Sequence, residues 1–148
     1  MARLHQDFKE FLKSFNDEGV RYLLIGGYAI SQYGYPRATA DLDVWIAVAP
    51  DNAARCVEAL KRFGMSVPEL TSDLFLAKNQ IVRMGVPPVR IEIHTGISGV
   101  AFEDCYTRHQ SVALDGIEVT MIGLDDLKAN KRASGRPRDL DDLENLPD

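Results

Sequence analysis

The chain has 148 residues, 45% of them hydrophobic and 26% charged, with 17 Lys and Arg against 22 Asp and Glu. This composition is typical of one soluble globular domain, and we predict a single domain over residues 1–148. The net charge of −5 disfavours sequence-independent binding to a long nucleic-acid backbone, because such binding needs many basic side chains to neutralise phosphates.

The hydrophobic residues are not gathered into a membrane segment. The longest uncharged stretch, residues 22–36, contains three glycines and a proline, so it does not resemble the roughly 20 apolar residues of a membrane helix. The first ten residues are charged and lack the apolar centre of a signal peptide. Cys56 and Cys105 lie far apart and outside any Cys-x-x-Cys spacing. We therefore expect a cytoplasmic protein with two free thiols and no membrane contact.

Periodic apolar residues divide the chain into helices and strands. The predicted elements, in chain order, are a helix from Leu4 to about Gly19, a strand over 21–25, a short helix over 28–33, a strand over 41–48, a helix capped by Asp51 and ending at Gly64, strands over 80–84 and 89–94, a helix over 100–109, a hairpin of strands 112–114 and 117–122 around Asp115-Gly116, and closing helices over 124–134 and 137–146. The elements mix without strict βαβ repetition. We therefore predict an α+β fold in which helices pack on a mixed β-sheet.

Acidic side chains recur on one face of two predicted strands. Side chains alternate across a strand, so Asp41 and Asp43 share one face while the apolar residues between and after them share the other. The later strand over 89–94 repeats this pattern, with Arg90, Glu92 and His94 on its polar face. If the two strands are neighbours, three carboxylates converge.

Converging carboxylates need compensation, since two like charges about 5 Å apart repel by roughly 3 kcal/mol at an effective dielectric constant near 20. Ligation by several carboxylate oxygens suits Mg²⁺ or Mn²⁺ better than zinc. An Asp-x-Asp pair can also simply decorate a solvated strand face. The ligand interpretation gains support from Gly26-Gly27, which precedes Asp41 by thirteen intervening residues and follows an apolar strand. Such a turn lets backbone N–H groups approach an anion closely.

The spacing of these motifs resembles the polymerase-beta-type nucleotidyltransferase superfamily. The resemblance rests on Leu24-Ile-Gly-Gly27, then Asp41-Leu-Asp43-Val, with Glu92 on a later strand. The segment 34–41 that leads into the first acids and the closing segment 124–142 extend the resemblance. Within the superfamily, the chain looks closest to the minimal abortive-infection and toxin-antitoxin members. It departs from the family pattern in two ways: Tyr28 follows the glycine pair where a serine is common, and Glu92 stands where many relatives have Asp.

The resemblance implies a nucleotidyltransferase-like fold and a Mg²⁺- or Mn²⁺-dependent transfer of a nucleoside monophosphate, most plausibly AMP from ATP, to a hydroxyl group. The acceptor is expected to be RNA, a protein or a small molecule, within a toxin-antitoxin or phage-defence system that supplies a partner toxin or antitoxin. The implied catalytic and metal-binding residues are Asp41, Asp43 and Glu92, and the implied nucleotide-binding residues are Gly26, Gly27, Arg37, Thr39, Lys131 and Arg136.

Several of these interpretations have an alternative. Lys131 and Arg136 belong to a basic stretch that either contacts phosphate or lies on the surface, and Arg37 is functional only if its loop folds over the glycine turn. We expect His94 to be structural rather than a ligand, and Trp45 to pack under the N-terminal helix rather than border a base. The alternative function is a catalytically weak nucleotide-binding or antitoxin-like module that acts through a partner protein.

Overall fold

The computed structural model describes residues 4–36, 41–86 and 88–148 of the chain. Within these ranges, helices and strands follow one another in the predicted order. The strands are β1 (Tyr22–Ile25), β2 (Asp41–Ile46), β3 (Ile81–Met84), β4 (Arg90–His94), β5 (Gln110–Leu114) and β6 (Ile117–Met121). The helices are α1 (Gln6–Asp17), α2 (Gly26–Gln32), α3 (Pro50–Phe63), α4 (Phe102–Thr107), α5 (Leu124–Ser134) and α6 (Pro137–Asn145), with a 3₁₀ turn, η1, at Ser72–Phe75.

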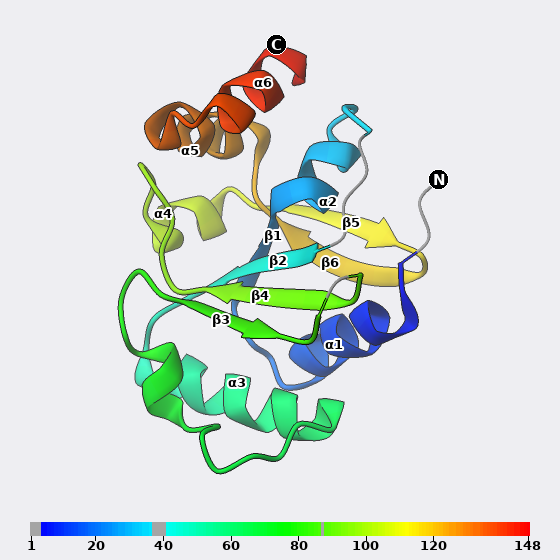
Figure 1. The fold of residues 1–148 in the computed structure, drawn as a ribbon, viewed down its shortest axis with the longest axis vertical. Coiled ribbons are helices and arrows are strands. Elements are labelled where there is room, and N and C mark those ends of the chain that lie inside the picture. Colours follow the sequence, from blue (N-terminus) through cyan, green and yellow to red (C-terminus); the bar gives the residue numbers. More distant parts are fainter. Residues whose placement is uncertain (1–3, 37–40, 87) are drawn as a thin grey trace.

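The described strands form one mixed sheet in the order β3-β4-β2-β1-β6-β5 (Figure 1). The β2–β4 and β1–β6 pairs are parallel and the other pairs are antiparallel. The β5–β6 hairpin turns at Asp115 and Gly116, whose φ angles are 50° and 82°. Positive φ at both positions is what a tight two-residue hairpin requires. The predicted mixed sheet and this hairpin are both confirmed.

The main hydrophobic core lies between the sheet and the pair of helices α1 and α3. Figure 1 shows these two helices on one side of the sheet, and α5 and α6 on the other. The predicted apolar stripe of α1 is buried, and the rings of Phe11 and Phe15 lie 4.2 Å apart. From the sheet, Leu42, Val44 and Ile46 are fully buried. The opposite face of β2 therefore looks toward α5 and α6.

Several local boundaries differ from the prediction, including those of α4 and the start of β5, which begins at Gln110 rather than 112. Helix α2 begins at Gly26 itself, so the glycine pair forms its first turn rather than a separate turn before residue 28. Strand β2 ends at Ile46, two residues early. Helix α3 begins at Pro50, and the predicted cap by Asp51 is wrong: Ala49 is the cap residue and makes no side-chain cap bond. Proline suits the first helical position because its φ is preset and its missing N–H has no helical partner there.

Both cysteines are buried and free, as predicted. Burial raises the pKa of the Cys56 thiol to about 12 and that of Cys105 to about 11. These thiols are therefore protonated and unreactive at neutral pH. Among the helices of the described ranges, we find none with both the length and the apolar character needed to cross a membrane.

Candidate active site

The parallel pairing of β2 with β4 brings the predicted acids of the two strands together. Asp43 lies opposite Glu92 in the register, and Asp41 lies opposite Arg90. Because side chains alternate across each strand, all four point to the same face, away from α1 and α3. The expectation that Asp41 and Asp43 share a face, and that Glu92 lies on a neighbouring strand, is confirmed in this geometry.

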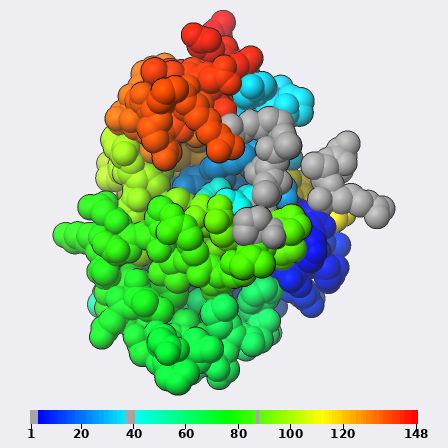
Figure 2. All heavy atoms as spheres, viewed as in Figure 1, coloured from blue at the N-terminus to red at the C-terminus, as the bar shows by residue number. Residues whose placement is uncertain are grey.

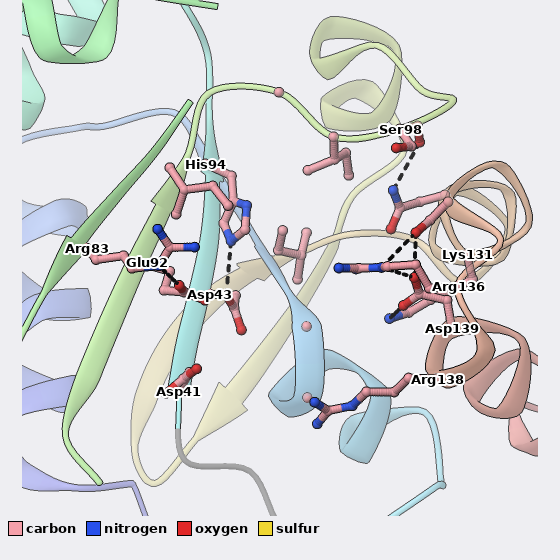
Figure 3. A pocket seen from close by; sticks show the side chains of 18 of the residues that line it. Asp41, Asp43, Arg83, Glu92, His94, Ser98, Lys131, Arg136, Arg138 and Asp139 are labelled. Carbon is pink, nitrogen blue, oxygen red and sulfur yellow. Dashed lines mark hydrogen bonds and ion pairs between the residues drawn. The ribbon is translucent and has the colours of Figure 1, made fainter. Parts of the chain in front are cut away.

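Asp43 belongs to a compact group of potential metal ligands in the part of the chain that the structure describes. His94 Nε2 lies 2.9 Å from Asp43 Oδ1, and Figure 3 shows the ring pointing toward that carboxylate. One ligand atom each from Asp43, Glu92 and His94 can be chosen so that all lie within 4.8 Å of one another. The three side chains are half-buried. Two carboxylates and an imidazole at such separations fit a divalent cation.

Two arginines neutralise the neighbouring acids. Arg90 donates to both carboxylate oxygens of Asp41, at 2.7 and 3.2 Å. This hydrogen bonding with Asp41 raises the pKa of the Arg90 guanidinium. On the edge strand β3, Arg83 lies opposite Glu92 in the register and donates to it at 2.6 Å. The repulsion expected between converging carboxylates is therefore relieved by arginine within the chain itself.

Gly26 brings the backbone against Asp43. Its φ is +72°, a conformation that side chains other than glycine rarely adopt, and a Cβ atom placed on it would lie 2.5 Å from Asp43 Oδ2. Gly27 is buried in the same first turn of α2. Both glycines line the cleft with the acids. Only a residue without a side chain fits at position 26 while Asp43 keeps its place.

The site residues line an open cleft of about 1150 Å³. Figure 2 shows it as a hollow between α5 and α6 on one side and β3 and β4 on the other. The sheet supplies the acids, while the facing wall carries side chains that include Lys131, Arg136 and Arg138. Figure 3 shows the two groups on opposite sides of the space. A cleft of this size accommodates a ligand as large as a nucleotide.

On the far wall, Lys131 connects α5 to α6. Its buried ammonium lies 3.0 Å from Asp139 and 3.2 Å from Asp142. Burial alone would raise the pKa of Asp139, but hydrogen bonds from Ser134, Arg136 and Lys131 outweigh it and lower the pKa to about 2. Lys131 therefore lies at the cleft with its charge already paired. Arg136 also donates to Asp139, at 2.7 Å, but its side chain is largely exposed.

Three further residues were discussed from the sequence: Arg37, Thr39 and Trp45. Arg37 and Thr39 lie outside the described residues. Trp45 is buried, so its expected packing in the interior is confirmed, but it lies on the face of β2 opposite α1 and stands edge-on to Phe102 of α4 at 5.2 Å rather than under the N-terminal helix.

The sequence interpretation placed Arg90 on the acid-bearing face without giving it a role, and it missed Arg83. Both share the alternation that marks the acids: Arg90 is two residues before Glu92, and Arg83 lies on the polar face of β3. Alternation alone could have placed Arg83 on the acid-bearing face as well, once a β3–β4 hairpin was assumed.

A family model described as "Nucleotidyltransferase of unknown function (DUF6036)" matches residues 1–146. No curated protein matches the chain. Among solved structures, the chain is similar to one described as a "putative nucleotidyltransferase (TM1012)" from Thermotoga maritima, with a TM-score of 0.60 and 14% identity over 93% of this chain and 88% of that one. That likeness shows the nucleotidyltransferase-like fold. Because the family model spans almost the whole chain, the protein belongs to this nucleotidyltransferase family.

Proposed function

We propose that the protein transfers a nucleoside monophosphate, AMP from ATP, to a hydroxyl group of an RNA, protein or small-molecule acceptor, with Mg²⁺ or Mn²⁺ as cofactor. In this reaction the acceptor oxygen bonds to the α-phosphorus, the bond from that phosphorus to the pyrophosphate oxygen breaks, and the hydroxyl proton passes to water. The observation that carries the proposal is the pairing of Asp43 with Glu92 on the floor of a nucleotide-sized cleft, against Gly26.

Each group of residues has a role in this proposal. Asp41, Asp43 and Glu92 hold the metal, and the backbone of Gly26 and Gly27 faces the phosphates. The metal, when bound, supplies charge stabilisation to the oxygens that attack and leave phosphorus. Arg136, exposed on the facing wall, meets the phosphate end of the nucleotide. The same role for Lys131 requires its ammonium to leave Asp139 or Asp142.

Incubation with α-³²P-labelled ATP and Mg²⁺ or Mn²⁺ tests the proposal. RNA, protein and small-molecule extracts serve as acceptors, and GTP, CTP and UTP test the choice of base. We expect labelled acceptor and released pyrophosphate from the wild-type chain, and a loss of at least about 100-fold in Asp43→Asn, because a metal ligand is removed. Asp115→Asn is the matched control: it removes a carboxylate at the hairpin, where the positive φ suits asparagine.

One observation favours the second candidate, a nucleotide-binding or antitoxin-like module that acts through a partner protein. Asp41 and Glu92 are each already paired with an arginine, so metal binding must displace or share these contacts. This candidate predicts that calorimetry detects ATP binding while no acceptor is labelled with either metal. That result would refute the transferase proposal, whereas labelling that depends on Asp43 would refute the module.

A further inference from the structure

Of the three histidines in the chain, His94 alone lines the cleft. We infer that His94 is a nitrogen ligand of the divalent metal held by Asp43 and Glu92, and that this ligand makes the site prefer Mn²⁺ to Mg²⁺. The inference rests on the proposed metal-dependent function and goes beyond its all-carboxylate site. It also reverses the expectation that His94 is structural.

The strand register places His94 where a ligand must be. It lies two residues beyond Glu92 on β4, so both side chains point to the cleft face, and Asp43 lies directly opposite Glu92. The Nε2–Oδ1 distance of 2.9 Å matches the separation of about 3.0 Å between adjacent ligands of an octahedral ion with bonds near 2.1 Å. All three ligands stand on paired strands, which hold side chains more precisely than loops do.

The side chains are also accessible to an ion. His94 and Asp43 are 15% and 16% exposed, and both line the open cleft. Glu92 is 13% exposed, and it pairs with Arg83, a more exposed side chain at the sheet edge. An ion that enters from the cleft can therefore replace the hydrogen atom of the hydrogen bond between Asp43 and His94 without movement of the strands.

The chemistry of the donor set leads to the metal preference. Mg²⁺ is bound through carboxylates, phosphates and water, and it gains little from imidazole. Mn²⁺ accepts carboxylate oxygens equally well, and transition metals bind imidazole nitrogen more readily. One nitrogen among the ligands therefore raises the affinity for Mn²⁺ relative to Mg²⁺.

Pulsed EPR of the full chain loaded with Mn²⁺ alone tests the inference without any activity measurement. A directly bound imidazole gives ¹⁴N modulation of the Mn²⁺ echo. We expect this modulation in the wild-type chain and its loss in His94→Gln. His109→Gln is the matched control, because His109 is exposed and hydrogen-bonded to the Tyr106 carbonyl oxygen outside the cleft; its spectrum should equal that of the wild type.

Metal titrations give the second measurement. In His94→Gln, Mn²⁺ affinity should fall about tenfold or more while Mg²⁺ affinity changes less, so the Mn²⁺/Mg²⁺ preference falls. Bound Mn²⁺ without ¹⁴N modulation in the wild-type chain would overturn the inference and leave the transferase proposal standing. Failure of the wild-type chain to bind Mn²⁺ at millimolar concentration would overturn both. The wild-type spectrum decides even if His94→Gln does not fold.

Discussion

Replacing Gly26 with alanine should damage stability and the metal site together. The backbone at φ +72° costs an L-residue about 1–2 kcal/mol. The new methyl group would also lie 2.5 Å from Asp43 Oδ2 and 2.9 Å from Asp43 Cβ, well inside the optimal carbon contact of about 3.5–4.0 Å. Rotating the carboxylate does not relieve the second contact, because Cβ is fixed to the backbone of β2.

Relief of that contact requires β2 and α2 to separate, and such overpacking costs about 1–3 kcal/mol. We therefore expect Gly26→Ala to lower the free energy of unfolding by about 2–5 kcal/mol, and to lower Mn²⁺ affinity at least about tenfold because Asp43 no longer aligns with Glu92. Urea denaturation and EPR titration of free Mn²⁺ measure the two effects.

Gly116→Ala separates backbone strain from crowding. Its φ of +82° resembles that of Gly26, but no atom beyond the adjacent residues lies within 4 Å of an added Cβ. This control should lose only about 1–2 kcal/mol of unfolding free energy and bind Mn²⁺ like the wild-type chain. Equal losses of stability in the two variants, or unchanged Mn²⁺ affinity in Gly26→Ala, would show that the close approach to Asp43 has no consequence.

Three further predictions follow from the same structure. The pKa of Asp139 lies at about 2, below its ordinary 3.8, so the ionised carboxylate stabilises the fold above pH 4. This contribution of about 2 kcal/mol to the free energy of unfolding is lost as the pH falls from 4 to 2. The urea midpoint should therefore change less with acid in Asp139→Asn than in the wild-type chain. Cys56, buried and with its pKa raised to about 12, should resist thiol reagents at pH 8 until urea unfolds the chain. Mn²⁺ at 100 times its dissociation constant should stabilise the wild-type fold by about 2.7 kcal/mol, and Asp43→Asn should abolish this gain.

The fold was predictable where one local rule decides it. The period of 3.6 in α1 and the period of two in β2 each fix which residues are buried, and burial of Phe11 and Leu42 agrees with both. Helix starts were harder to predict, because capping depends on which residue leaves the helical conformation. Asp51 is a good cap by type, but the helix begins at Pro50 and its cap is Ala49, two positions before Asp51.

The pairing of Lys131 could not be read from the sequence. Its position among basic residues indicated a solvated or phosphate-binding side chain, but α5 and α6 fold back on each other and bury it between Asp139 and Asp142. That contact depends on the angle between two helices joined by Gly135, which local pattern does not specify. A buried ammonium needs such partners, since leaving it unpaired costs several kcal/mol.

The site itself depends on a register that alternation cannot choose. A one-residue slip of β4 against β2 would turn Glu92 into the core, so burial excludes it. A two-residue slip in either direction keeps every side chain on its correct face, yet it sets Glu92 opposite Asp41 or Arg90 opposite Asp43, so that Asp43 and Glu92 no longer face each other. The observed register instead sets Leu42 beside Ile91 and Val44 beside Ile93, all buried. The packing of the core face therefore determines which polar side chains meet on the cleft face: alternation predicts that Asp43, Glu92 and His94 can share a face, and only the register decides which of them stand opposite one another.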